Sequence, residues 1–571
     1  MATGSGVHRL ADRYVERFAA LDPVTASGEG IGGHDHEMTD WSPEGCEARA
    51  DHDRATLREL ATIDITDDAD RIATEVLRER LELGIEEHEA GERLRDLRVL
   101  GSNVQAVRMA FDLMPRDTLH DWEVVAERMA LVPQGLASIQ DGLSEGARRG
   151  VVAARRQVVG TVAQTDVWGG VASSGGDGGD GGARPFFLTL VDELDASGVG
   201  APAPLRARLE ELATRATEAY AALGRYLVDE YLPHAAEADG VGRERYTLYS
   251  RDFNGITLDL DETYAWGWDE LHRIEHAMAE VAERIIPGAT VDEVIDHLEH
   301  DPTRTIEGVD EFRRWNQDLL DSTVAALDGV HFDIPEPVKA VEAMIAPPGG
   351  PAAMYYTGPA EDFSRPGRTW YPTLGRTSFP LWGEVSICYH EGVPGHHLQI
   401  AQVRYLADSL TRFQRTLAGT SGHAEGWALY AERLMGELGF LEDPAFELGM
   451  LRAQAMRAVR VVVDIGMHLQ LRIPAHERYA PGEVWTPELA LPFVIERSKF
   501  PEDFMASEVD RYLGLPGQAI SYKVGERVWL QARDDARARH GSEFDLKEFH
   551  RAALDLGPMG LAQLATELAR L

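Results

Sequence analysis

Apolar side chains recur at spacings of three and four residues through most of this sequence, and this helical period constrains the fold more than any other feature. In segment 203–233, Leu205, Leu209 and Leu212 lie on one apolar stripe that ends near Pro233. Six further segments show the same period: 51–93, 122–148, 262–286, 308–328, 444–473 and 545–571. Because strand-like alternation is rare, we predict a mainly α protein.

Two segments interrupt the helical pattern. Residues 169–183 are rich in Gly and Asp and contain little to bury, which predicts a disordered surface loop. Residues 346–375 are rich in Pro, Gly and aromatic side chains, which favours a shaped loop that lines a cleft. The clearest strand signal, 368–372, lies in this second segment and has 354–357 as its candidate partner. We expect 368–372 to be an edge strand that pairs with extended substrate.

The charge balance narrows the classes of partner. The 571 residues include 56 Lys and Arg against 96 Asp and Glu, a net charge of −40. Such a surface repels phosphate backbones and anionic lipids, so we expect neither nucleic acid nor a membrane as a partner. The two cysteines, Cys46 and Cys388, are far apart, and the start of the sequence has no apolar leader pattern. These features predict a cytoplasmic protein.

The densest group of chemically active side chains lies between Tyr389 and Gln399. Three histidines and one glutamate fall within the eight residues from His390 to His397. Neutral imidazole is the commonest protein ligand for zinc, and a glutamate beside a ligating histidine takes a proton from zinc-bound water. The sequence therefore predicts a Zn²⁺ site with His390 as a ligand and Glu391 as the general base.

The spacing of the histidines requires a break in the helix. His390 and His397 are seven residues apart, about 10.5 Å of rise on an unbroken helix. Two nitrogens that each lie about 2.0–2.1 Å from one zinc ion cannot be so distant. Pro394 breaks a helix and Gly395 lets it restart in a new register. Looping out three residues selects His397 and looping out two selects His396; we favour His397 and keep His396 as the alternative.

The third ligand is expected from a second helix over residues 421–437. Glu425 lies 28 residues beyond His397, and Glu432 follows it by seven residues on the same helical face. We predict Glu425 as the third zinc ligand, because catalytic zinc sites commonly have three protein ligands and one open position. Glu432 is expected to support a ligand or to be a surface acid, and His423 is a weaker candidate ligand.

Three motifs resemble the bacterial family called domain of unknown function 885. They are Tyr-His-Glu-Gly-Val-Pro-Gly-His-His at 389–397, Glu-Gly-Trp-Ala-Leu-Tyr-Ala-Glu at 425–432 and Pro-Gly-Gln-Ala-Ile-Ser-Tyr-Lys at 516–523. That family looks like a relative of the helical zinc peptidases of the thermostable-carboxypeptidase and angiotensin-converting-enzyme type. The resemblance implies a mainly α, zinc-peptidase-like fold, with two halves that flank a deep cleft and a small β element near the metal site.

The resemblance extends over most of the chain, through similar text at 246–260 and 362–367. We therefore predict a single peptidase-like unit over residues 1–571. Residues 1–345 are expected to be mostly scaffold helices, and residues 346–571 are expected to carry the metal and catalytic side chains.

Further candidates lie outside the metal motif. Tyr522 is the first choice for the donor that stabilises the oxyanion, because the related peptidases place a tyrosine late in the chain. His468 is a second candidate, since Asp464 lies four residues before it and can orient its ring. Three cations are candidates to bind a substrate carboxylate, in the order Lys523, Arg511 and Arg460.

The leading hypothesis is a zinc-dependent peptidase that acts on small peptides as a carboxypeptidase or dipeptidase. The same machinery would also hydrolyse a non-peptide amide or ester, which is the second hypothesis. A third is a non-catalytic, metal-stabilised helical protein, although a structural site needs no base such as Glu391. A di-iron carboxylate bundle needs two Glu-x-x-His repeats, which this region lacks.

Overall fold

The structure is a computed structural model that describes residues 4–171, 184–346 and 353–571, and it is mainly helical, as predicted. The Gly- and Asp-rich segment is outside the described residues from 172 to 183. The chain divides into two compact units, Met1–Asp239 and Gly240–Leu571. Residues 240–345, expected to be mostly scaffold helices, belong to the same compact unit as the metal motif.

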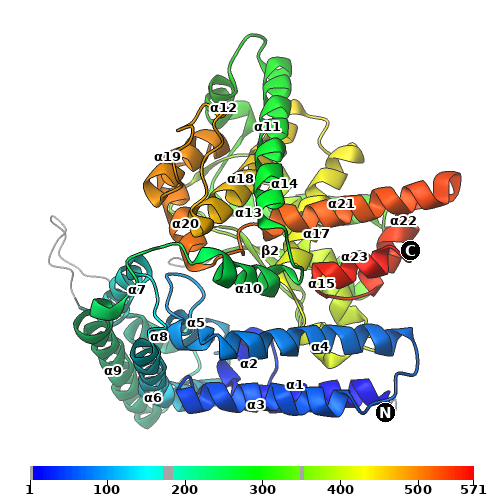
Figure 1. The fold of residues 1–571 in the computed structure, drawn as a ribbon. Helices are drawn as coiled ribbons and strands as arrows, with labels where there is room; N and C mark the ends of the chain where they lie inside the picture. Colours follow the sequence, from blue (N-terminus) through cyan, green and yellow to red (C-terminus); the bar gives the residue numbers. More distant parts are fainter. Residues whose placement is uncertain (1–3, 172–183, 347–352) are drawn as a thin grey trace. The chain divides into compact units, whose positions relative to one another are not determined.

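The first unit consists of helices around one apolar core. Helices α1, α3 and α4 lie side by side (Figure 1), and Trp122 of α6 and Tyr220 of α9 are buried in the core. Its helices are α1 Gly6–Leu21, α2 Pro23–Gly28, α3 Pro43–Leu60, α4 Asp68–Glu89, α5 Asn103–Leu113, α6 Leu119–Arg149, α7 Arg155–Trp168, α8 Phe186–Ala196 and α9 Ala203–Tyr226. Short helical turns are η1 Glu92–Arg95, η2 Leu227–Tyr231 and η3 Leu232–His234.

The second unit surrounds α18 (Pro444–Leu469), in which almost every residue from Ala453 to His468 is buried. Its other helices are α10 Gly242–Asn254, α11 Leu260–Ile285, α12 Val291–Glu299, α13 Val309–Leu327, α14 Glu384–Glu391, α15 His396–Tyr405, α16 Arg412–Thr416, α17 Ser421–Glu437, α19 Pro487–Ser498, α20 Glu502–Gly514, α21 Ser521–His540, α22 Leu546–Asp555 and α23 Leu561–Leu568. Short turns are η4 Pro302–Arg304, η5 Glu336–Lys339 and η6 Gly541–Glu543.

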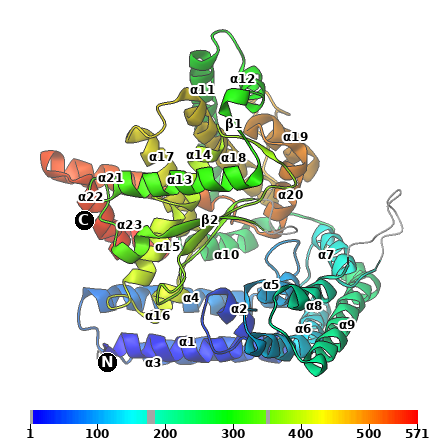
Figure 2. The ribbon, with the colours of Figure 1, turned by 180° about the vertical axis from the view of Figure 1, so that it is seen from behind.

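The small β element predicted near the metal motif is present. Strands β2 (Val341–Ile345), β4 (Gly367–Tyr371) and β3 (Tyr355–Thr357) form one sheet in that order, and α13 lies against β2 (Figure 2). The pairing of 354–357 with 368–372 is confirmed, because β3 runs antiparallel to β4. The expectation of an edge strand is wrong: β2 and β3 occupy both sides of β4, so no backbone is left there for a substrate.

A second, two-stranded sheet joins β1 (Thr305–Glu307) to β5 (Ser378–Pro380). The ring of Phe379 in β5 stacks on Phe312 of α13 with centroids 4.2 Å apart. Tyr371 at the end of β4 packs edge-on against the ring of Phe312. This aromatic core fixes β5 directly before α14, the helix that carries His390.

Candidate metal centre

The backbone between α14 and α15 leaves the helix over four residues, as the Pro-Gly pair predicted. A Cβ at Gly395 would lie only 2.0 Å from the carbonyl oxygen of His390, so no larger residue fits there. The Gly395 N–H donates to the Tyr389 carbonyl at 3.0 Å, and the Trp427 indole N–H donates to the Pro394 carbonyl at 2.8 Å. This closed loop brings the rings of His390 and His396 to 4.7 Å from each other.

His390, His396 and Glu425 converge at the junction of α14, α15 and α17. Glu425 Oε2 lies 3.3 Å from His390 Nε2 and 3.4 Å from His396 Nε2. All three atoms lie within 4.8 Å of one another. Ligand atoms about 2.0–2.1 Å from a tetrahedral zinc ion are about 3.3–3.4 Å apart. The two distances from Glu425 Oε2 match that edge length, so the residues present fit a zinc ion.

Two glycines set the position of Glu425. A Cβ at Gly426 of α17 would lie 2.4 Å from the Gly525 Cα of α21. Because neither residue has a side chain, the two helices cross at backbone contact. This crossing brings Glu425 of α17 and Tyr522 of α21 together beside His390.

Glu432 orients the ring of His390 from the side opposite Glu425. Its Oε1 lies 2.7 Å from His390 Nδ1, while Ser386 donates a hydrogen bond to its Oε2. With Nδ1–H directed at Glu432, the other nitrogen of His390 faces Glu425. Burial lowers the pKa of His390, but its hydrogen bonds to Glu425 and Glu432 raise that pKa to about 9. A metal ion would therefore displace a proton from His390 when it binds.

Glu391 is a buried carboxylate without a partner. Its side chain is 7% exposed and makes no hydrogen bond or ion pair with the described residues. Burial raises the pKa of Glu391, and the positive charges of His390 and His396 offset part of that rise. A buried carboxylate with a raised pKa beside the two histidines is suited to accept a proton from water.

Tyr522 lies beside the cluster, as predicted for an oxyanion donor. Its ring stacks on His390 at 6.4 Å, and the guanidinium groups of Arg460 and Arg457 lie 4.5 and 5.7 Å from its centre. The hydroxyl makes no hydrogen bond with the described residues. Burial and the negative charge of Glu425 raise the pKa of Tyr522, so its hydroxyl keeps its proton and is available as a donor.

His397 is outside the cluster, which corrects the choice of second ligand. The Tyr356 hydroxyl donates to His397 Nδ1 at 2.9 Å, and His397 Nε2–H donates to the Val338 carbonyl at 2.7 Å. Both ring nitrogens are used, and burial lowers the pKa of His397 to about 4. Because α15 restarts at His396, two residues loop out rather than three, and the alternative ligand His396 faces Glu425.

His468 is also fixed away from the cluster. Its Nε2–H donates to the Tyr512 carbonyl at 3.0 Å, and the Val241 N–H approaches its Nδ1 at 3.4 Å. Asp464, expected to orient this ring, has its Oδ1 3.6 Å from His468 Nε2, while its Oδ2 accepts hydrogen bonds from the Tyr246 hydroxyl and the Gly517 N–H. The structure therefore assigns His468 a structural role and does not bring it to the predicted catalytic position.

The predicted carboxylate-binding cations are already paired. Lys523 is fully buried and binds Glu526, Gln454 and Glu270, the last two at 2.8 and 2.7 Å. Arg511 and Arg460 both bind Glu508. The guanidinium of Arg460 lies 4.5 Å from the centre of the Tyr522 ring, and its Nη1 has no hydrogen-bond partner among the described residues.

Sequence reasoning missed three supporting residues. Arg457 packs on Tyr522 and lies 3.7 Å from Glu432, Trp427 anchors the loop before α15, and Gly525 allows the close helix crossing. A usable signal existed for Trp427 and Gly525, since both lie within or just beyond the recognised motifs. Arg457 had no such signal, because its role depends on which face of α18 is turned toward Tyr522.

The second unit is thus a mainly helical domain with a His–His–Glu cluster suited to bind a metal ion. The chain belongs to the bacterial family described as "Bacterial protein of unknown function (DUF885)", whose model matches residues 23–568. This confirms the family identified from the three motifs. No curated protein matches the chain.

Two solved structures share the fold. One is described as "the putative lipoprotein from Colwellia psychrerythraea"; it has a TM-score of 0.82 and 23% sequence identity, with 99% of each chain covered. The other is described as "a putative lipoprotein of unknown function from Shewanella oneidensis"; it has a TM-score of 0.72 and 16% identity, again with 99% of each chain covered.

These descriptions contradict the predicted cytoplasmic location. A lipoprotein is held at a membrane surface by covalent lipid. The two proteins of the same fold are therefore described as membrane-anchored, whereas the prediction for this chain was a cytoplasmic protein. The prediction rested on the absence of a leader pattern and on two distant cysteines, and neither feature reports how a protein is anchored. In the part of the chain that the structure describes, no helix has the length and apolarity needed to span a bilayer.

Proposed function

We propose that this protein is a zinc-dependent hydrolase that cleaves peptide bonds of small peptides, as a carboxypeptidase or dipeptidase does. The observation that carries the proposal is the cluster of His390, His396 and Glu425 with the unpartnered carboxylate of Glu391 beside it. A site that only stabilised the fold would need no such carboxylate. The resemblance of the motifs to the helical zinc peptidases supports the same assignment and the peptidase-like fold.

Each side chain has a distinct task in this proposal. When bound, zinc supplies Lewis-acid activation of water and of the scissile carbonyl at a site with three protein ligands and one open position. Glu432 holds His390 in the ring orientation that directs Nε2 to the cluster. Glu391 accepts the proton of the attacking water and returns it to the leaving amine.

Tyr522 stabilises the charge that develops on the carbonyl oxygen. Its hydroxyl has no hydrogen-bond partner among the described residues and keeps its proton, so it is available as a donor in the transition state. Arg460 and Arg457 pack on the ring of Tyr522 and hold it beside His390.

Metal content and turnover on one preparation test the proposal. Elemental analysis should find one zinc ion per chain, and a fluorogenic peptide panel should show turnover that a chelator removes and added zinc restores. Turnover of esters or non-peptide amides, without peptides, would select the second hypothesis. A full complement of zinc without turnover of any of these substrates would leave a metal-stabilised protein and overturn the proposal.

Substitution of the base tests the mechanism. Glu391→Gln keeps the shape of the side chain but removes its basicity, so it should retain zinc and lose at least about two orders of magnitude in turnover. Glu384→Gln is the matched control, because Glu384 lies on the same helix and is 8% exposed, close to the 7% of Glu391. Burial raises the pKa of Glu384 to about 7, so below that pH its carboxyl is neutral. The neutral amide of Gln therefore changes its charge little. Equal losses in both variants would exclude Glu391 as the base.

A further inference from the structure

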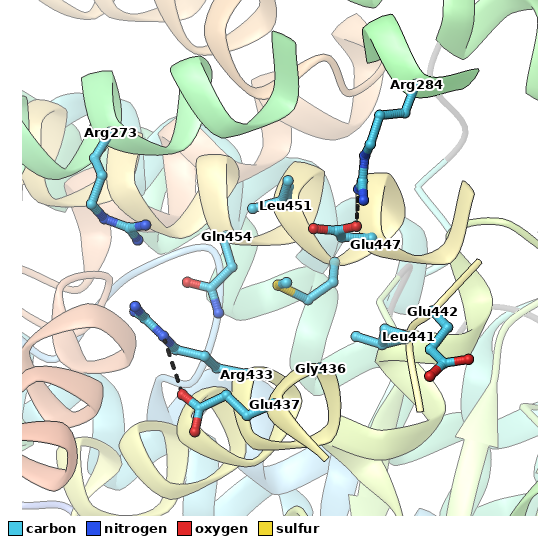
Figure 3. Close-up of a pocket in the computed structure, with 11 residues that line it drawn as sticks. Arg273, Arg284, Arg433, Gly436, Glu437, Leu441, Glu442, Glu447, Leu451 and Gln454 are labelled. Carbon is cyan, nitrogen blue, oxygen red and sulfur yellow. Dashed lines mark hydrogen bonds and ion pairs between the residues drawn. The ribbon is translucent and has the colours of Figure 1, made fainter. Parts of the chain in front are cut away.

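A cavity of about 550 Å³ lies between α11, α17 and α18 in the second unit (Figure 3). It is lined by three arginines, three glutamates, three apolar side chains, one glycine and Gln454. None of the residues of the candidate metal centre is among them. The cavity therefore offers a separate site with its own chemistry.

The floor of the cavity contains an unsatisfied donor. Gln454 is 3% exposed, and its Oε1 accepts a hydrogen bond from Lys523 Nζ at 2.8 Å. This bond fixes which end of the amide faces Lys523 and leaves the other end, Nε2, directed into the cavity (Figure 3). Nε2 is buried and has no hydrogen-bond partner among the described residues. A buried N–H group without an acceptor is unfavourable, so a ligand that accepts from it would be stabilised.

Two guanidinium groups point toward the same end of the cavity as this amide (Figure 3). Arg433 makes no hydrogen bond with the described residues: its Nε is 4.0 Å from Glu437 and its Nη1 is 3.8 Å from Glu526. Arg273 donates from Nε and Nη2 to Glu270, each at 2.7 Å. Arg433 is thus ion-paired at long range with Glu437 and Glu526 but donates no hydrogen bond to them, and Arg273 keeps one guanidinium nitrogen that donates none to Glu270.

Two of the three glutamates of the lining are held by arginines outside this group. Glu437 is held by Arg533 through bonds of 2.7 and 3.2 Å, and Glu447 is ion-paired with Arg284. Glu442 lies at the opposite end of the cavity from Arg273 and Arg433 (Figure 3). The apolar residues of the lining, Leu441, Met450 and Leu451, complete the wall.

We propose that this cavity binds a small organic anion. Its carboxylate or phosphate group is held by Arg433, Arg273 and the Nε2 of Gln454, because guanidinium and amide N–H groups together match the acceptors of an oxyanion. Its apolar part lies against Met450 and Leu451. The volume falls within the range of about 300–1,000 Å³ that small-molecule sites occupy. The proposal does not depend on the hydrolase activity.

Isothermal titration of the full chain tests the proposal with four probes: hexanoate, hexyl phosphate, inorganic phosphate and hexan-1-ol. Hexanoate or hexyl phosphate should bind saturably with one site per chain, and the stronger of the two identifies the head group. Inorganic phosphate should bind more weakly because it lacks the apolar part, and hexan-1-ol should not bind. Failure of both organic anions to bind, or equal binding of hexan-1-ol, would overturn the proposal.

Two arginine variants locate the site. Arg433→Gln should weaken binding of the preferred anion by at least about tenfold, because it removes donors that make no hydrogen bond to Glu437 or Glu526. Arg284→Gln is the matched control, since it makes the same charge change in the same lining but removes a guanidinium already paired with Glu447. It should change affinity by less than about twofold. Equal weakening in both variants would show a nonspecific charge effect and reject the site. If Arg433→Gln does not fold, Arg273→Gln, whose side chain is 47% exposed, replaces it.

Discussion

His396 and His397 are adjacent in the chain but have opposite surroundings, and single substitutions should separate their roles. His396→Ala removes one of the three proposed ligands and should abolish tight zinc binding. His397→Ala should keep zinc but lower stability by about 1–3 kcal/mol for each partner left unpaired, the Tyr356 hydroxyl and the Val338 carbonyl. Elemental analysis and thermal unfolding measure the two effects. Zinc retained by His396→Ala, with zinc lost from a folded His397→Ala, would reverse the assignment.

The sequence was sufficient for part of this site and not for the rest. The convergence of His390 and Glu425 could be predicted, because residue type and helical spacing limit which side chains come together. The second histidine could not, since loops of two and three residues both satisfy Pro394 and Gly395. The choice depends on the backbone contact between Gly395 and Tyr389, which residue type does not reveal. Burial is equally hidden, and for that reason Lys523 resembled a free cation.

His550 allows a test of pH dependence away from the metal centre. Its Nε2 lies 2.7 Å from the Tyr430 hydroxyl, and burial lowers the pKa of His550 to about 3. The folded state therefore keeps the ring neutral, while the unfolded chain binds a proton near pH 6.5. The stability that His550 contributes is complete above that pH and is lost as the pH falls toward 3.

The corresponding variant is His550→Gln, which keeps a polar side chain but does not titrate. Chemical denaturation of both proteins at pH 7.5 and pH 5 gives the stability difference between them at each pH. That difference should shift by about 2 kcal/mol against the wild type on acidification. A difference that does not depend on pH would show that His550 titrates normally in the folded state.

At the scale of whole elements, the crossing of α17 and α21 depends on the absence of two side chains. Gly426→Ala would place a Cβ 2.4 Å from the Gly525 Cα, so the helices must move apart. Overpacking of this kind costs about 1–3 kcal/mol, and it should also weaken zinc binding because Glu425 moves with α17. Denaturation and zinc titration of the variant measure both effects.

Gly436→Ala is the control on the same helix. Its Cβ would be 3.7 Å from Leu441, an ordinary contact. Alanine is favoured over glycine in a helix by up to about 1 kcal/mol, so this variant should be neutral or more stable. If the two variants lost equal stability, the helix crossing would not be the cause.

Helical periodicity predicted where helices occur better than where they end. The segment 545–571 is two helices, because Gly557 has a φ of +75° and Pro558 follows it. The segment 51–93 is also divided, since α4 begins at a cap in which Asp67 accepts from the Asp70 N–H. The central place of β4 could not be predicted, because it depends on pairing with β2, more than 20 residues earlier in the chain.

At the scale of the whole molecule, helical periodicity predicted the mainly helical fold, and motif resemblance predicted the family. The two compact units meet after Asp239, and helices lie on both sides of that point in the chain. Residues 235–242, which are mostly small or acidic, form a short linker-like stretch near this boundary. The compact unit that carries the His–His–Glu cluster begins about 100 residues before residue 346.

The net charge of −40 predicts the response of the whole protein to polyanions. Fluorescence anisotropy with a labelled random duplex should show no saturable binding at physiological salt, because neutralised phosphates supply most nonspecific affinity. Lower ionic strength strengthens the binding of a DNA-binding protein. Here it should extend the repulsion between the acidic protein and the duplex, because the Debye length grows from about 8 Å to about 30 Å as salt falls to 0.01 M. The titration repeated at low salt is therefore the stricter test. Saturable binding that tightens as salt is removed would reveal a basic surface that the overall charge conceals.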